Sequence, residues 1–200
     1  MNAPSDSAPR PVYLSVPASR PVVTYVLLGL IVLAFGAETL AGGSTQTDVL
    51  IKLGAKYTPL IVMGEYWRLF TAMFLHIGLM HLAFNAYALY SLGSAVEELF
   101  GAARFMGLYL LAGVAGNVLS FVGHDVVSAG ASGAIFGLLG AYIAYLLRYR
   151  RVFGAVGRQR LTRLLMIAVL NLALGMSPGI DNLAHLGGRI VGLGLGWAYC

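Results

Sequence analysis

Residues 22–41 read VVTYVLLGLIVLAFGAETLA, a continuous apolar run that decides the class of fold. At about 1.5 Å per residue, a helix of this length crosses a hydrocarbon core of roughly 30 Å. An apolar run near the N-terminus can also belong to a signal peptide, and the small residues at 40–43 suit a signal peptidase. The length of the run and the further apolar runs after it favour a retained transmembrane helix.

The whole chain has the composition of a membrane protein. Of its 200 residues, 58% are hydrophobic and only 10% are charged, which does not describe a soluble domain. The single cysteine, Cys200, excludes a disulfide scaffold. The net charge is +5, but six of the thirteen Lys and Arg residues lie between Arg148 and Arg163, beside apolar runs. We interpret this segment as a juxtamembrane basic loop and expect no nucleic-acid partner.

Apolar runs separated by polar or Gly- and Pro-bearing breaks recur along the chain and predict six spans. The expected fold is an all-α polytopic membrane protein with six transmembrane helices. Its embedded domain, residues 21–200, follows a flexible, proline-bearing tail, residues 1–20. Residues 42–77 are amphipathic and are expected to form an interfacial outer loop, anchored by Tyr66 and Trp67. The predicted spans are 22–41, 78–96, 105–122, 132–147, 161–177 and 182–199.

The distribution of Lys and Arg predicts the orientation of these spans. Nine such residues fall on one side of the membrane and three on the other, with Arg189 inside a span. Because Lys- and Arg-rich loops stay in the cytoplasm, both termini are expected there. The polar residues described next then lie in the outer half of the bilayer.

Polar side chains inside a span are costly and are therefore candidates for function. Ser132 lies in residues 130–137, GASGAIFG, at the start of the fourth span. The glycines leave open the approach that a nucleophilic hydroxyl needs. The alternative is that Ser132 caps the helix, while Gly133 and Gly137 form a small-residue packing face. The G-x-S-x-G elbow of soluble hydrolases is not matched, because Ala134 takes the place of its second glycine.

His185 lies one turn into the sixth span, and glycines follow at Gly188, Gly192 and Gly196. Glycine at every fourth residue lets another helix approach to backbone contact. If that partner is the fourth span, the imidazole can reach Ser132. The alternative is that His185 is a proton relay or a structural hydrogen-bonding group.

His81 and Asn85 are one helical turn apart and project from the same face, where both can donate hydrogen bonds to an oxyanion. Interhelical hydrogen bonding is the alternative. His76 and His81 are five residues apart and do not form the i, i+4 pair of a zinc helix, and no H-E-x-x-H motif occurs, so metal-dependent proteolysis is not expected. No cofactor is expected. Asp181 is expected to cap the last helix rather than complete a catalytic triad. Arg189 is given no catalytic role.

Three segments together resemble the motifs of the rhomboid family of intramembrane serine proteases. They are residues 76–85, HIGLMHLAFN, residues 130–133, GASG, and residues 184–188, AHLGG, in the family's order. Trp67-Arg68 and residues 95–97, AVE, add to the match. The chain is most similar to the bacterial, six-helix form, which implies an integral protein of the cytoplasmic membrane with a site that opens to the outer side.

The resemblance implies hydrolysis of a peptide bond in or near the transmembrane segment of a membrane-protein substrate, without metal or cofactor. Ser132 would be the nucleophile and His185 the general base, while His81, Asn85 and the Ser132 amide would stabilise the oxyanion. Many family members carry Tyr four residues after the nucleophile, where this chain has a phenylalanine that can stack but lacks the phenol hydroxyl. The resemblance assigns supporting roles to Gly130, Gly133, Phe136 and Gly188.

Two other functions are open at this point. A proteolytically silent relative that binds membrane helices would be expected to lack Ser132 or His185, and both are present. A proton-coupled transporter with His81 and His185 as relay groups is disfavoured, since neither inverted repeats nor carboxylates inside the spans are expected.

Overall fold

The computed structural model describes residues 20–123, 125–174 and 180–200, with the backbone alone for residues 168–174. The predicted tail, up to residue 19, lies outside the described residues. The fold is all-helical in the described part, which also has one isolated antiparallel β-bridge, between Lys56 and Ser128. In chain order the elements are α1 (Val22–Leu40), α2 (Thr47–Leu53), α3 (Thr58–Val62), α4 (Arg68–Thr71), the 3-10 turn η1 (Ala72–Phe74), α5 (Leu79–Ala88), the π-helical turn η2 (Leu89–Gly93), α6 (Ser94–Phe100), α7 (Ala102–Gly123), α8 (Ser132–Arg148), α9 (Arg150–Leu174) and α10 (Asn182–Ala198).

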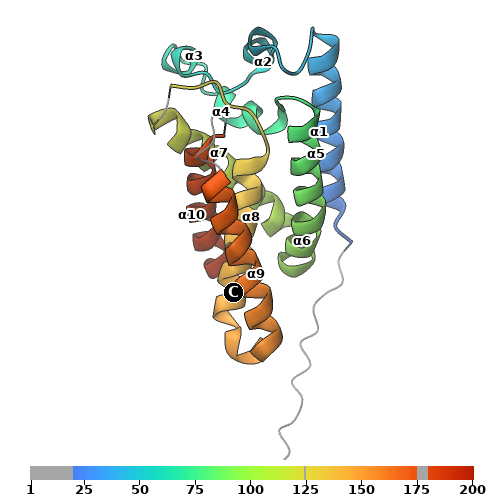
Figure 1. The fold of residues 1–200 in the computed structure, drawn as a ribbon, viewed down its shortest axis with the longest axis vertical. Coiled ribbons are helices and arrows are strands. Elements are labelled where there is room, and N and C mark those ends of the chain that lie inside the picture. Colours follow the sequence, from blue (N-terminus) through green and yellow to red (C-terminus); the bar gives the residue numbers. More distant parts are fainter. Residues whose placement is uncertain (1–19, 124, 175–179) are drawn as a thin grey trace, which may run out of the picture.

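Helices α7, α8 and α10 pack against one another and form the centre of the bundle. Helix α1 runs beside α5 and α6 on one side, and α9 packs on α8 (Figure 1). The short helices α2 and α3 lie over the end of the bundle at which α1 ends (Figure 1). Residues 42–77, expected as an interfacial loop, therefore fold into short helices at that end.

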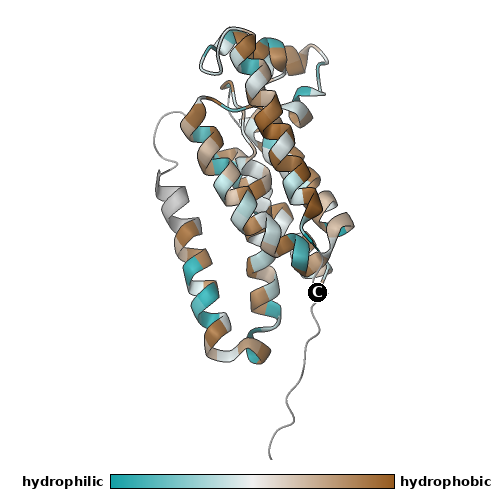
Figure 2. Ribbon diagram, turned by 90° about the vertical axis from the view of Figure 1, so that its right-hand side faces the viewer, coloured by the Kyte–Doolittle hydropathy of each residue, from teal (hydrophilic) through white to brown (hydrophobic). Residues whose placement is uncertain are grey.

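Two of the described helices, α1 and α7, are long and apolar enough to cross a membrane. A third candidate is a bent pair, Arg68–Phe74 with Leu79–Phe100, whose halves meet at 90°. The apolar helix α8 is shorter, with 17 residues. Hydrophobic residues cover most of the helix surfaces, and hydrophilic residues gather toward the two ends of the bundle (Figure 2). The chain is a multi-pass membrane protein, while six complete spans remain a prediction.

The basic segment between Arg148 and Arg163 is helical, and the prediction of a loop there was wrong. Helix α8 ends at Arg148 and α9 begins at Arg150. Within α9, Gly154 breaks the helical geometry with φ 51° and ψ −129°. Arginine is a strong helix former, and a basic run continues a helix unless another residue interrupts it. The charge pattern indicated the polarity of the segment but not its backbone conformation.

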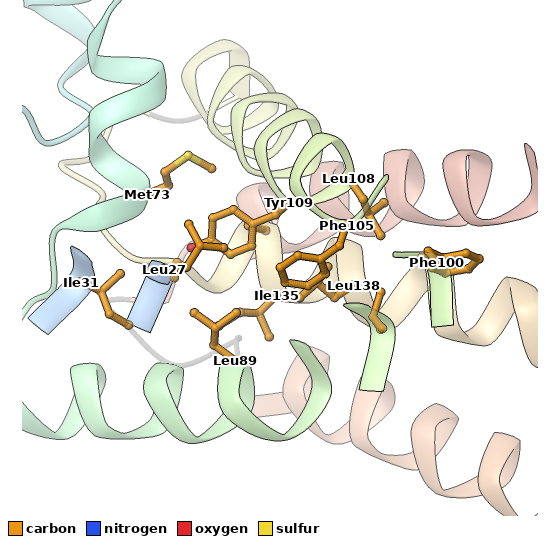
Figure 3. Packing of buried hydrophobic residues seen from close by; sticks show 14 of the residues in the cluster. Leu27, Ile31, Met73, Leu89, Phe100, Phe105, Leu108, Tyr109, Ile135 and Leu138 are labelled. Carbon is orange, nitrogen blue, oxygen red and sulfur yellow. The ribbon is translucent and has the colours of Figure 1, made fainter. Parts of the chain in front are cut away.

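The hydrophobic core lies between α1, η2 and the α7–α8 pair (Figure 3). Ile31 of α1, Leu89 of η2 and Phe105 of α7 are fully buried there. Lipid tails are as apolar as these side chains, so close packing rather than removal from water stabilises helix contacts within a bilayer. The core therefore fixes α8, which carries Ser132, against the rest of the bundle.

Among the described residues, two glutamates, Glu38 and Glu97, are fully buried. Glu38 lies inside the predicted span 22–41, contrary to the expectation that the spans hold no carboxylate, whereas Glu97 lies just beyond the predicted span 78–96. Glu97 of α6 accepts hydrogen bonds from the backbone N–H groups of Val23 and Thr24, at 2.9 and 2.7 Å, and from the Thr24 hydroxyl, at 2.7 Å. It thereby satisfies amide groups that the start of α1 leaves unpaired. Glu38, near the end of α1, accepts a hydrogen bond from the His76 N–H at 3.0 Å. Neither contact can be predicted from the sequence, because each joins segments that are far apart in the chain.

Candidate active site

Ser132 and His185 meet between α8 and α10. Ser132 is the first residue of α8, and the Nε2 atom of His185 lies 2.9 Å from its Oγ atom. The residue at the capping position of α8 is Ala131, and no side chain caps this helix. The alternative that Ser132 is a helix cap is therefore wrong, and its hydroxyl is directed to the imidazole.

The glycines of α8 and α10 account for this short distance. A Cβ atom at Gly188 would overlap the carbonyl oxygen of Gly133, and one at Gly192 would overlap that of Gly137. Backbone contact of this kind is possible only where neither helix carries a side chain. The helix that packs on the glycines of α10 is thus α8, which begins at the start of the fourth predicted span.

The imidazole of His185 contacts an aromatic ring, and no carboxylate of the described residues binds it. The Phe136 ring stacks on the imidazole, with centroids 4.3 Å apart and planes tilted by 33°. The Nδ1 atom of His185 is buried and has no hydrogen-bond partner among the described residues. Asp181 instead caps α10 by accepting a hydrogen bond from the Ala184 N–H at 3.0 Å, as expected. The geometry within the described chain is that of a pair rather than a triad.

His81, Asn85 and Gly130 lie together beside Ser132. Gly130 has φ 143°, a conformation that favours glycine. A Cβ atom placed there would lie 2.9 Å from Nε2 of His81 and 3.6 Å from Nδ2 of Asn85. That Nδ2 atom is buried and has no partner in the described part of the chain. The amide of Asn85 is therefore available to donate a hydrogen bond in this space.

The hydrogen bond from Ile77 indicates which nitrogen of His81 carries the proton. The backbone N–H of Ile77 donates to Nδ1 of His81 at 3.4 Å. When the ring is neutral, Nε2 then bears the hydrogen. Because Nε2 faces Gly130, the neutral imidazole of His81 can act as a second hydrogen-bond donor beside Asn85.

The loop before Ser132 is held by contacts that sequence analysis missed. The Gly130 N–H donates to the carbonyl of Ala72 at 2.9 Å. Lys56 pairs with Ser128 through its backbone, and its buried ammonium group donates to the carbonyl of Val126 at 2.9 Å. Burial lowers the pKa of Lys56, although nearby aspartates oppose the shift. The sequence indicated only that Lys56 lies in an amphipathic segment, and not that it holds the loop before Ser132.

Asp181 links this loop to the start of α10. It accepts a hydrogen bond from the Ser120 hydroxyl at the end of α7. Burial raises the pKa of Asp181, but hydrogen bonds from Ser120, Ala184 and Ser128 and the charge of Lys56 lower it, and the net pKa lies below its ordinary value. The ionised carboxylate therefore stabilises this junction.

His76 and His81 lie closer together than their spacing suggests, with ring centroids 5.3 Å apart. This is possible because His76 precedes α5 and does not follow its helical geometry. Among the described residues, no group of three or more His, Cys, Asp or Glu side chains is placed to hold a metal ion.

The fold and the site together define an all-helical membrane protein in which a serine hydroxyl is paired with an imidazole beside two side-chain donors. The family model described as Rhomboid domain matches residues 63–200. The chain belongs to the rhomboid family.

Three curated relatives illustrate the similarity. The chain is 46% identical over 175 residues to Rhomboid protease GluP of Bacillus subtilis (strain 168), covering 86% of this chain and 34% of that protein. It is 40% identical over 154 residues to RHOMBOID-like protein 6, mitochondrial, of Arabidopsis thaliana, covering 76% and 50%. The Putative rhomboid protease YdcA of B. subtilis is 38% identical over 130 residues, covering 64% of each protein. The chain thus spans less than two thirds of the length of these relatives.

Proposed function

We propose that the chain is an intramembrane serine protease, which hydrolyses a peptide bond in or near the transmembrane segment of a membrane-protein substrate. The observation that carries this proposal is the 2.9 Å contact between Ser132 Oγ and His185 Nε2. In the first step Ser132 attacks the substrate carbonyl while His185 takes the hydroxyl proton and then gives it to the leaving amine. Water hydrolyses the acyl-enzyme in the second step, with His185 again accepting a proton.

His81 and Asn85 are proposed to stabilise the oxyanion that forms in both steps. The support is that Nε2 of His81 and Nδ2 of Asn85 both face the space beside Gly130, two residues before the nucleophile. The backbone amide of Ser132, at the start of α8, is a further donor because the first amides of a helix have no partner within it. Donors fixed in advance around a developing charge commonly supply 10²- to 10³-fold in rate each.

The proposed membrane architecture has six spans, with residues 1–20 as a cytoplasmic tail before the embedded domain, residues 21–200. Both termini would be cytoplasmic and the site would open to the outer side of a bacterial membrane, as the distribution of Lys and Arg favours. A helical segment keeps its carbonyls hydrogen-bonded, so a substrate must unwind before it can be attacked. Substrates with small or helix-breaking residues near the outer leaflet are therefore favoured.

The experiment that tests the proposal is cleavage of a single-span test substrate in proteoliposomes. Wild type and the control Ser91→Ala, which changes an exposed serine of η2, are expected to cleave it. Ser132→Ala and His185→Ala are expected to lose cleavage. Undiminished cleavage by Ser132→Ala would overturn the proposed mechanism. Binding of the substrate by wild type without any cleavage would favour a silent, helix-binding relative, and proton-coupled uptake that survives Ser132→Ala would favour a transporter.

A further inference from the structure

Arg189 is a cationic side chain within the bundle, and the proposed mechanism does not use it. It follows His185 by one helical turn and lies seven residues after Asn182, about 10 Å along α10 at 1.5 Å per residue. Its Nε and Nη2 atoms are buried and have no hydrogen-bond partner among the described residues. An arginine stays charged and offers five N–H donors, so buried donors without acceptors are costly.

The guanidinium group lies against the candidate site. Its Cζ atom is 4.8 Å from the centroid of the Phe136 ring, and the same ring lies 4.3 Å from the imidazole of His185. Phe136 attracts the cation through its face but has no atom that accepts a conventional hydrogen bond. The ring therefore orients Arg189 beside the catalytic pair while leaving its donors unsatisfied.

Three carboxylates of the described helices and caps already accept hydrogen bonds from other groups. Glu97 accepts hydrogen bonds from the start of α1, Glu38 from His76, and Asp181 from the start of α10. Phospholipid phosphates gather at the ends of a transmembrane helix, whereas Arg189 lies about two turns inside α10. None of these described carboxylates therefore supplies an acceptor for Arg189, and a molecule that enters the site can bring one.

We propose, on the basis of the proposed function, that Arg189 is a specificity-determining residue that binds a carboxylate of the substrate close to the scissile bond. A carboxylate accepts two parallel hydrogen bonds from a guanidinium, and this charged pair is shorter and stronger than a neutral one. An extended segment advances roughly 3.3 Å per residue, so an Asp or Glu within about three residues of the scissile bond can reach it. The substrate class is a transmembrane segment with an acidic residue next to its cleavage point.

The test compares paired substrates in proteoliposomes. Asp is placed at each of the three positions on either side of the scissile bond of a single-span test substrate, and Asn replaces it in the matched partner. The measured quantity is the ratio of kcat/KM for the Asp substrate to that for the Asn substrate. At one or more positions, wild type is expected to give a ratio above ten. Arg189→Met is expected to bring it near one, and Arg189→Lys to an intermediate value.

The control is Arg104→Met, because Arg104 also lies over an aromatic ring, that of Tyr199 at 5.6 Å, but outside the site. It is expected to keep the wild-type ratio. Because the ratio compares two substrates on one variant, a loss of folded protein cancels. Two results would overturn the inference: a wild-type Asp/Asn ratio near one at every position, or the same ratio in Arg189→Met as in wild type. In both cases, cleavage of the substrates would still support the proposed function. Absence of cleavage by wild type would overturn both.

Discussion

Gly192 of α10 lies so close to Gly137 of α8 that a Cβ atom at position 192 would overlap the Gly137 carbonyl oxygen. One turn closer to the N-termini of both helices, Gly188 stands in the same relation to Gly133. These backbone contacts determine how far His185 lies from Ser132. The catalytic distance is therefore a property of the helix interface as much as of the two side chains.

Gly192→Ala is predicted to separate α8 from α10. Forcing a methyl group into a packed contact costs about 1–3 kcal/mol, so the melting temperature in detergent should fall, and substrate cleavage should fall at least tenfold. The matched control is Gly194→Ala, since a Cβ atom at Gly194 meets no described atom within 4 Å. Alanine there should be neutral or stabilising by up to about 1 kcal/mol through helix propensity. Equal stability and activity of the two variants would contradict this account.

Asn85→Ala is predicted to reduce kcat by about 10²- to 10³-fold with little change in melting temperature. The reason is that Nδ2 of Asn85 has no partner in the described chain, so removing it breaks no hydrogen bond of the resting fold. Asn85→Asp, which keeps the shape but loses the donor, should show a similar defect. Steady-state cleavage and thermal unfolding measure the two effects, and a loss of activity below threefold would count against the proposed role.

Glu97→Gln is predicted to destabilise the fold by weakening the attachment of α1. Three donors converge on the two carboxylate oxygens, and glutamine offers one oxygen and an NH₂ group that opposes a donor. Charge-assisted hydrogen bonds contribute about 1.5–3 kcal/mol, so the melting temperature should fall by several degrees. Glu98→Gln, at an exposed neighbouring position, should leave it unchanged. Identical melting temperatures for both variants would show that the Glu97 contact does not stabilise α1.

Asp181→Asn is predicted to remove a pH-dependent part of the stability. Asparagine keeps the helix cap but not the charge. Because the pKa of Asp181 in the fold lies below its ordinary value of 3.8, the ionised group stabilises the fold above about pH 4. That contribution disappears as the pH falls through the folded pKa. Unfolding in detergent between pH 3 and 7 should show wild type more stable at pH 6 and the difference shrinking below pH 4; a constant difference would refute the assignment.

Much of the helical framework, and the candidate pair Ser132 and His185, could be predicted from the sequence because both depend on local patterns of residues. Long apolar runs indicate α1 and α7. The four-residue glycine spacing after His185 predicts close contact with another helix, which in the structure is α8. Asp181 was identified as a cap from its position alone, since capping depends on residues within one turn.

The contacts that escaped prediction join distant segments. The chain separates Thr24 from Glu97 by 73 residues, and Lys56 meets Val126 across 70. Nothing in the local pattern of either residue indicates its partner, because the pairing exists only after the helices have packed. The stacking of Arg189 on Phe136 likewise depends on how α8 and α10 cross.

Whether Ser132 and His185 act as a catalytic pair is best decided by labelling the detergent-solubilised protein with a fluorophosphonate, followed by mass spectrometry of the adduct. We expect one phosphonyl group on Ser132 in wild type, and no label in folded Ser132→Ala or His185→Ala. The 2.9 Å pairing of hydroxyl and imidazole is what should activate this serine above every other serine in the chain. A folded wild type that takes no label, or equal labelling of His185→Ala, would contradict the claim that Ser132 and His185 act as a catalytic pair.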